Sequence, residues 1–157
     1  MSKELALKLK EGDQAPDFTA VTQTGETVSL SGCSGRNVIL YFYPRDNTPG
    51  CTKEACAFRD HFAEFKNKGA MIFGISPDAI KSHQKFVEKY KLPFTLLADE
   101  DKKIAIAYEA WGQKSFLGRK YMGTRRITFL IGADGRIKKI WPKVKPAEHA
   151  LEVLAAL

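Results

Sequence analysis

The amino-acid sequence predicts one α/β domain, a sandwich of helices on a mixed β-sheet. The chain has 157 residues, 44% of them hydrophobic and 27% charged, which is ordinary for a single globular domain with a substantial core. Short apolar runs typical of buried strands alternate with segments of helical periodicity. Near the C-terminus this alternation ends in a hairpin pattern and a helix, so parallel and antiparallel strands should share one sheet.

The first predicted elements are a hairpin and a buried strand. Residues 17–30 alternate around Thr24-Gly25, a pattern typical of a β-hairpin. Within NVILYFYP, residues 37–44, the apolar run Val38 to Tyr43 ends at Pro44 and favours a central strand buried on both faces.

A long helix should follow, and Gly69 should end it. The segment 51–68 spaces its apolar residues by three or four positions, as a helix with one buried face does. These residues are Ala55, Phe58, Phe62 and Phe65.

The rest of the chain is predicted to contain four strands and three helices. The expected strands are residues 70–76, residues 93–99 and the two arms of a hairpin within 125–141 that turns at Asp134-Gly135. The expected helices are residues 78–92 with Ile80, Phe86, Val87 and Tyr90 facing inward, residues 100–111, and residues 146–157 led by Pro146. Because no repeat or linker-like stretch interrupts the chain, residues 1–157 are expected to form a single domain.

The sequence favours neither a membrane protein nor an exported one. The longest strongly apolar run, Val38 to Tyr43, is far too short to span a bilayer. Near the N-terminus, Lys8 and Lys10 interrupt the apolar pattern of Leu5, Leu7 and Leu9, so a continuous apolar signal core is missing. The expected location is therefore the cytoplasm, with no membrane partner.

The net charge of +7 comes chiefly from the segments 118–126 and 136–145. Such charge can bind nucleic acid, but none of the usual nucleic-acid-binding motifs accompanies it. A solvated basic face, or a surface that steers an acidic protein partner, is the simpler interpretation. We therefore expect no nucleic-acid partner.

Three cysteines are an odd number and too few for a disulfide framework, so a catalytic or redox-sensing use is favoured in a reducing cytoplasm. Cys51 follows Thr48, a suitable N-cap, and Pro49, a suitable first helical residue. Unpaired backbone N–H groups and the helix dipole stabilise an anion there, so they should lower the thiol pKa from about 8.5. The alternative is that Cys51 is a small apolar residue that only packs.

Cys56 follows Cys51 by five residues. On an intact helix this spacing separates the two Cα atoms by roughly 8.6 Å, beyond the limit of roughly 7 Å for a disulfide. Either Cys56 is an inert core residue, or the first turns unwind after Cys51 has reacted and the two thiols then meet.

Two other cysteine-based sites fit the sequence poorly. A thioredoxin-type Cys-x-x-Cys would need a second cysteine at the position of Glu54. A metal site built from Cys51, Cys56 and His61 would use helical residues five apart, which point in different directions.

The run YPRDNTPGCTKEAC resembles the peroxiredoxins, whose Pro-x-x-x-Thr-x-x-Cys signature matches Pro44, Thr48 and Cys51. The second cysteine five residues later is similar to the bacterioferritin-comigratory, or Q-type, subfamily. The resemblance extends from about Gly12 to the last helix. Four further stretches resemble the subfamily in the same order, namely residues 75–90, 94–101, 111–123 and 125–137.

This resemblance implies a thioredoxin-like fold with an N-terminal β-hairpin extension. It also implies a thiol-dependent peroxidase that reduces hydrogen peroxide and organic hydroperoxides. Thioredoxin or a similar dithiol protein would donate the electrons, and no metal, flavin or haem cofactor would be needed. One alternative is a thiol-disulfide oxidoreductase on the same fold, which the missing Cys-x-x-Cys disfavours. A non-enzymatic basic binding module is the other, and only the charge supports it.

The resemblance also implies roles for individual residues. Cys51 would be the peroxidatic cysteine and Cys56 the resolving cysteine, joined after the reaction in an intramolecular disulfide. Arg126, which stands one residue before the strand sequence TFLI, would hold the peroxide oxygens and stabilise the thiolate. The adjacent Arg125 would point to the other face of that strand.

Four more residues are candidates around the thiol. The hydroxyl of Thr48 would hydrogen-bond the peroxide while still accepting from the helix N–H groups as a cap, and Pro44 would shield the thiolate from water. Glu54 and Arg59 match residues common in the subfamily and would support the site from behind. Solvent-facing helix charges are the alternative interpretation of both.

Other residues fall outside the subfamily pattern. Cys33 is expected to be a lone loop thiol, the alternative being a rival resolving cysteine or an intermolecular disulfide site. His61, His83 and His149 are expected on helix surfaces, and Trp111 is expected to pack on the sheet rather than flank the pocket. Because the expected disulfide lies within one helix, no dimer is required and a monomer is expected.

Overall fold

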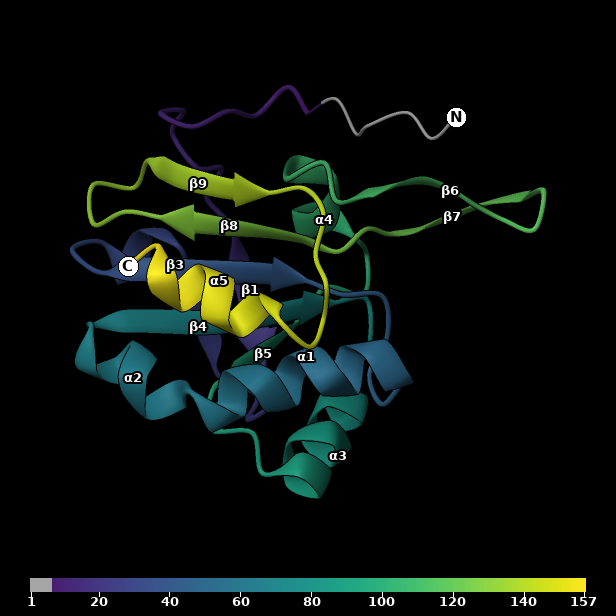
Figure 1. Cartoon of the computed structure of the whole chain (residues 1–157), viewed down its shortest axis with the longest axis horizontal. Helices are drawn as coiled ribbons and strands as arrows, with labels where there is room; N and C mark the ends of the chain where they lie inside the picture. The colour runs from purple at the N-terminus through teal and green to yellow at the C-terminus, as the bar shows by residue number, and fades with distance from the viewer. Residues whose placement is uncertain (1–6) are drawn as a thin grey trace.

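The computed structural model describes residues 7–157, so Leu5 of the N-terminal pattern lies outside the described residues. A seven-stranded mixed sheet forms its centre, with the strand order β2-β1-β5-β4-β3-β8-β9 (Figure 1). The strands are β1 (Thr19–Thr22), β2 (Thr27–Ser29), β3 (Asn37–Phe42), β4 (Ala70–Ser76), β5 (Thr95–Ala98), β8 (Ile127–Ile131) and β9 (Ile137–Trp141). The predicted sandwich on a mixed sheet is confirmed, and each strand predicted within it is present.

β3 is the central strand, as predicted, and it pairs in parallel with β4 and antiparallel with β8. All its side chains from Val38 to Phe42 are buried, which suits a strand covered on both faces. Because successive side chains alternate between the faces, Ile39 and Tyr41 enter one core cluster. Val38, Leu40 and Phe42 enter the other.

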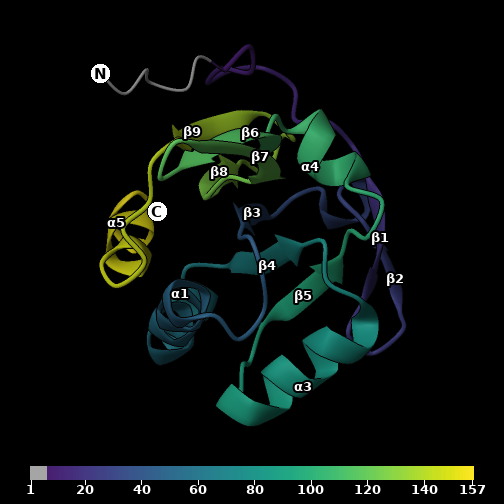
Figure 2. The same cartoon turned by 90° about the vertical axis from the view of Figure 1, so that its right-hand side faces the viewer.

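Helices cover both faces of the sheet (Figure 2). α1 (Pro49–Asp60), α2 (Phe62–Asn67), α3 (Ile80–Tyr90) and α5 (His149–Ala155) contribute to the core cluster of Ile39 and Tyr41. α4 (Lys103–Ala107) packs on the opposite face. A short 3-10 helix (Ser31–Cys33) precedes β3. Within the described part of the chain, no helix has both the length and the apolar character that crossing a membrane requires.

The long helix predicted over residues 51–68 is wrong in one respect, because it is divided into α1 and α2 at His61. There the backbone leaves the helical region, with φ −108° and ψ 11°. On a continuous helix, Phe58 and Phe65 would stand roughly 10.5 Å apart along the axis. The break instead brings their rings to a centroid distance of 5.6 Å within one core cluster.

Two later helices are shorter than predicted. The helix expected over residues 100–111 is confined to α4. α5 begins at His149 rather than at Pro146, because the residues between them form a separate turn closed on the carbonyl oxygen of Lys145.

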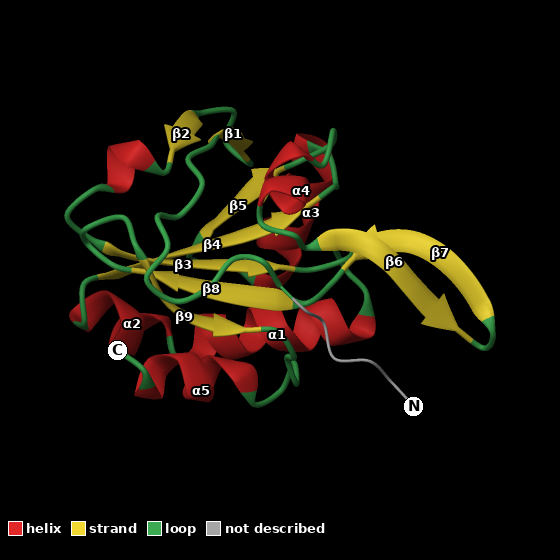
Figure 3. Ribbon diagram, turned by 90° about the horizontal axis from the view of Figure 1, so that it is seen from above, coloured by secondary structure: helices red, strands yellow, loops and turns green. Residues whose placement is uncertain are grey.

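One hairpin has no counterpart among the predicted elements. β6 (Trp111–Phe116) and β7 (Arg119–Thr124) pair antiparallel as a separate two-stranded sheet, across a turn at Leu117-Gly118. This β6–β7 arm projects from the body of the molecule (Figures 1 and 3). Most of its residues are exposed on both faces, so the alternation that reveals a half-buried strand is weak there.

Candidate active site

Cys51 is the third residue of α1, so it lies in the first turn of a helix, as the sequence predicts. Residues 43–48 connect the end of β3 to the start of α1. Because β3 and β4 are parallel, this loop lies at the carboxyl edge of the parallel strands, where ligands bind in many α/β sheets. Cys51 is only 1% exposed, so its sulfur is almost completely covered in this structure.

Thr48 occupies the predicted N-cap position with an extended backbone (φ −91°, ψ 158°). Its hydroxyl does not cap α1, however, and the prediction of a side-chain cap is wrong for this conformation. Instead Oγ1 donates to the carbonyl oxygen of Arg45 at 2.9 Å, which fixes the loop that also carries the half-buried Pro44.

Arg126 approaches Cys51 directly, since its Nη2 lies 3.1 Å from the Cys51 sulfur. A permanently charged guanidinium at this distance stabilises a thiolate over a thiol. The neighbouring Arg125 extends elsewhere, because its Nη2 donates to the carbonyl oxygen of Gln113 on β6 at 3.0 Å. The structure therefore separates the two arginines as the sequence predicts.

Gly50 makes the close approach of Arg126 possible. A Cβ atom at Gly50 would stand 2.8 Å from Nη2 of Arg126, closer than such atoms pack. Any larger residue at this position must therefore move the guanidinium that contacts Cys51.

Glu54 holds the other side of the same guanidinium. Nη1 of Arg126 donates to Oε1 of Glu54 at 3.2 Å, and the Glu54 side chain is 1% exposed. Burial raises the pKa of Glu54 to about 7, although the charge and hydrogen bond of Arg126 oppose that rise. The alternative interpretation of Glu54 as a solvent-facing charge is wrong, because α1 directs it to the same buried face as Cys51.

Arg59 lies further along α1 and serves a different contact. Its Nη1 donates to the carbonyl oxygen of Tyr90 at 2.7 Å, and its Nε pairs with Asp60 at 3.1 Å. The bond to Tyr90 joins α1 to the C-terminal end of α3, so the geometry supports an architectural use of Arg59.

Cys56 shares the unbroken helix α1 with Cys51, and both thiols are free. The helix therefore keeps them too far apart to bond, as the spacing argument predicts. The first turn of α1 has no side-chain cap, no acidic residue and Gly50 at its second position, so its helical backbone is weakly stabilised even though Cys51 itself is buried. Half-buried Cys56 is not a core residue, which favours the interpretation that the turn opens.

Lys114 is a further cation near the thiol that the sequence reasoning missed. It lies on β6, and its Nζ donates to the carbonyl oxygen of Thr124 at 3.0 Å. Burial lowers the pKa of Lys114, Arg126 lowers it further and Cys51 opposes this, so the ammonium feels both groups of the site. Only the register of the unpredicted β6–β7 arm brings it there.

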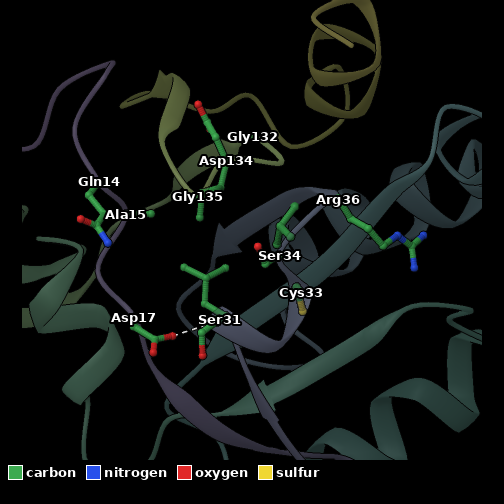
Figure 4. Close-up of a pocket in the computed structure, with 13 residues that line it drawn as sticks. Gln14, Ala15, Asp17, Ser31, Cys33, Ser34, Arg36, Gly132, Asp134 and Gly135 are labelled. Atoms are coloured by element: carbon green, nitrogen blue, oxygen red, sulfur yellow. Dashed lines mark hydrogen bonds between the residues drawn. The ribbon is translucent and has the colours of Figure 1, made fainter.

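Cys33 lies before the start of β3, whereas Cys51 follows its end. β3 has six residues and thus a length of roughly 20 Å. Cys33 lines a separate cavity of about 250 Å³ together with Asp134 of the β8–β9 turn (Figure 4). Burial raises the pKa of the Cys33 thiol, with Arg36 opposing, so this cysteine is not activated.

Two of the three histidines are buried, so their predicted surface positions are wrong. His83 contacts Oδ2 of Asp46 at 2.7 Å and the carbonyl oxygen of Leu97 at 3.0 Å, which fastens the loop after β3 to α3. Nε2 of His149 lies 2.7 Å from the hydroxyl of Thr128. Polar contacts at these rings offset part of the cost of burial, although Nδ1 of His149 has no hydrogen-bond partner among the described residues. Helical periodicity does not reveal such contacts.

The predictions for Trp111 and His61 agree better with the structure. Trp111 packs partly buried against the core, with Nζ of Lys102 5.1 Å from its ring centre, in agreement with the packing interpretation. His61 is half-buried and lies 3.1 Å from a carboxylate oxygen of Glu64.

Known proteins are similar to the chain over most of its length. The chain matches the model of the AhpC/TSA family over residues 11–140. It is 47% identical to peroxiredoxin Bcp of Bacillus subtilis over 96% of each chain.

Solved structures resemble the chain over most of its length. A cysteine mutant of PrxQ from Xylella fastidiosa gives a TM-score of 0.91 at 32% identity and covers 96% of both chains. The bacterioferritin comigratory protein of Xanthomonas campestris, whose structures concern alkyl peroxide reduction, gives a TM-score of 0.84 at 37% identity over 88% of both chains.

Proposed function

Because the chain belongs to the AhpC/TSA family, and is a thiol-dependent peroxidase with the thioredoxin-like fold of the peroxiredoxins, we propose that Cys51 is the thiol that attacks the peroxide. The fold and enzyme class implied by the resemblance are confirmed by these relatives. The observation that carries the assignment of Cys51 is its 3.1 Å contact with Arg126 in the first turn of α1.

In the first step, the Cys51 thiolate attacks the terminal oxygen of a hydroperoxide. The S–O bond forms as the O–O bond breaks, and the departing oxygen takes up a proton to become water or an alcohol. Cys51 is thereby oxidised by two electrons to a sulfenic acid. Arg126 lies against the sulfur and also stabilises the negative charge on the departing oxygen.

Thr48 and Pro44 shape the approach of the substrate. While the Thr48 hydroxyl donates to Arg45, its oxygen can still accept a hydrogen bond from the peroxide O–H. The backbone N–H of Cys51, in the first helical turn, is a donor for the peroxide oxygens. Half-buried Pro44 keeps water from the sulfur. Glu54 supports Arg126 from behind.

In the second step, the Cys56 thiolate attacks the sulfenic sulfur of Cys51. The S–S bond forms, and the hydroxide that leaves takes up a proton to become water. The first turn of α1 opens for this step, because the wound helix keeps the two sulfurs apart.

A dithiol protein of the thioredoxin type then reduces the Cys51–Cys56 disulfide through a mixed disulfide and is itself oxidised. The cycle needs only the two thiols, the hydroperoxide and this reductant. We place it in the cytoplasm, where thiols are kept reduced, and in a monomer, since both cysteines belong to one helix.

Mass spectrometry after one equivalent of hydrogen peroxide tests the whole scheme. The wild type should contain a Cys51–Cys56 disulfide within one chain, and Cys56→Ser should retain a sulfenic acid at Cys51 but lose turnover with thioredoxin. Cys51→Ser should consume no peroxide, whereas the control Cys33→Ser should behave as the wild type. Peroxide consumption by Cys51→Ser would refute the attacking role, and unchanged turnover of Cys56→Ser would refute the resolving role.

A further inference from the structure

The β6–β7 arm combines exposed apolar side chains with positive charge. Six large apolar residues are exposed in the described chain, and four of them lie on this arm. They are Phe116 (67% exposed), Leu117 (88%), Tyr121 (46%) and Met122 (55%). Residues 110–126 also contain five cations and no acidic residue. Apolar surface gathered in this way marks a site of contact.

The turn of the arm places its most exposed apolar side chain in an unfavourable backbone conformation. Leu117 and Gly118 both have positive φ, 51° and 79°. Two-residue hairpin turns of this kind favour Asn-Gly, because a leucine is strained in the left-handed region. An exposed leucine in this strained conformation does not stabilise the fold. Leu117 is therefore suited to a contact with another molecule.

The apolar side chains surround the tip rather than form one flat face. Lys114 pairs with Tyr121 and Phe116 with Arg119, so Phe116 and Tyr121 share one face of the ribbon. Met122 lies on the opposite face, and Leu117 is at the turn. A protein docking on one face would leave the other in water, whereas a lipid interface encloses both.

We propose that the arm inserts its tip into the surface of an anionic lipid bilayer, where the enzyme reduces phospholipid hydroperoxides in place. Apolar side chains enter the headgroup region, and the cations beside them contact lipid phosphates. The sequence predicts no membrane partner because it has no long apolar segment, but docking at the surface needs none. This inference rests on the proposed role of Cys51.

The arm also leads to the catalytic residues. Lys114, which feels the charges of Cys51 and Arg126, is three residues from Leu117, a distance of about 10 Å along the strand. A hydroperoxyl group on an acyl chain is polar and favours the interface over the hydrocarbon interior. Its terminal oxygen passes to Cys51 as in the first step above, leaving a lipid alcohol and the sulfenic acid.

Sedimentation with vesicles tests the docking. The protein should bind vesicles of phosphatidylglycerol and phosphatidylcholine, lose binding at high salt and leave phosphatidylcholine vesicles unbound. Leu117→Asn suits the turn better than leucine, so it preserves the arm while removing the apolar tip, and it should weaken binding several-fold. Lys120→Gln should weaken it about fivefold. The control Leu151→Asn, at an exposed position of α5, should bind as the wild type.

The matching activity assay separates this inference from the proposed function. Leu117→Asn should reduce phosphatidylglycerol hydroperoxide in vesicles several-fold more slowly, with unchanged reduction of hydrogen peroxide. Equal vesicle binding by wild type and Leu117→Asn, or no binding by either, overturns the inference but leaves the role of Cys51 standing. A wild-type dimer that Leu117→Asn converts to monomers, without vesicle binding, would show that the tip joins two copies and would overturn it as well.

Discussion

The guanidinium of Arg126 joins the two ionisable groups of the site, with Nη1 on Glu54 and Nη2 on Cys51. Because burial raises the pKa of Glu54 to about 7 against the effect of Arg126, the charge behind the arginine changes near neutral pH. Below that pH, Glu54 is mostly neutral and Arg126 offers its charge to the Cys51 sulfur alone, whereas above it the ionised Glu54 competes for that charge. Glu54 therefore modulates the charge that Arg126 offers to Cys51.

Gly50→Ala should slow the reaction of Cys51 with hydrogen peroxide, on the order of tenfold to a hundredfold. The new Cβ would stand 2.8 Å from Nη2 of Arg126 and would push the flexible guanidinium away from the sulfur. Alanine also favours the helix over glycine by roughly 0.5 to 1 kcal/mol, so the rate should fall without loss of stability. Stopped-flow measurement of peroxide reduction and thermal unfolding give the two quantities.

Gly112→Ala is the matched control, because its Cβ would displace the guanidinium of Arg125 instead. It should leave the peroxide rate close to that of the wild type. If Gly50→Ala reacted as fast as the wild type, the contact between Arg126 and Cys51 would not be needed for the reaction.

Several site residues could be predicted from the sequence because they belong to one local motif, and others could not. Cys51 and Thr48 stand in a helix start that local rules recognise, although the rules do not reveal that the Thr48 hydroxyl bonds to Arg45. Glu54 follows Cys51 by three residues on the buried stripe of α1, so helical spacing alone could have indicated its burial. No local sequence motif indicates that Lys114 lies near the site, because only the strand register of the β6–β7 hairpin brings it there.

Among the elements, α1 is well packed in its second half and weakly stabilised in its first turn. Ala55 and Phe58 are fully buried in the core, whereas the first turn has Gly50 and no side-chain cap. A helix of this kind opens from its N-terminal end at small cost. The weak turn contains Cys51, which is the cysteine that has to move.

Oxidation should therefore increase hydrogen exchange in the first half of α1. Amides of residues 51–56 should exchange about tenfold faster or more in the disulfide form than in the reduced protein, because the bond cannot form on the wound helix. Exchange measured by mass spectrometry can use α3, at residues 80–90, as an internal control that stays unchanged. Equal protection of residues 51–56 in both forms would exclude the unwinding.

Elements with one buried face could be predicted closely, and those shaped by tertiary contacts could not. The strand at residues 70–76 is present with both its predicted ends, because its apolar run is bounded by Gly69 and Pro77. The break at His61 accompanies the packing of Phe58 against Phe65, a tertiary contact that helical periodicity does not reveal. The β6–β7 arm could not be predicted, because neither of its faces is buried in the core and its sequence therefore lacks the alternation of a half-buried strand.

For the whole molecule, the order of strands brings the catalytic pair together. β3 and β8 are antiparallel neighbours with Phe42 opposite Ile127, so the end of one strand and the start of the other share an edge of the sheet. Cys51 after β3 and Arg126 before β8, 75 residues apart in sequence, converge at that edge. Local sequence patterns do not determine which strands pair, so this contact could be predicted only through the family resemblance.

Burial of Glu54 also makes the stability of the whole chain depend on pH. The pKa of Glu54 is raised by burial from 4.5 to about 7 in the folded chain. Below pH 4.5 the carboxyl is protonated in both folded and unfolded chains. As the pH rises toward 7, the unfolded chain loses this proton first, so the folded state holds more protons and the free energy of unfolding falls. A rise from 4.5 to about 7 corresponds to a decrease of about 3 kcal/mol.

Glu54→Gln should flatten this decline, because the amide does not ionise. Arg126 can still donate to its oxygen, but the new NH₂ group replaces Oε2, which has no hydrogen-bond partner among residues 7–157. The unpaired NH₂ group adds a cost that does not change with pH, so the slope rather than the absolute stability decides. Urea unfolding between pH 4.5 and 8 measures that slope, with Glu88→Gln on the exposed face of α3 as the control that keeps it. If the slope of Glu54→Gln equalled that of the wild type, Glu54 would ionise alike in the folded and unfolded chains and would already be charged beside Arg126 in mild acid.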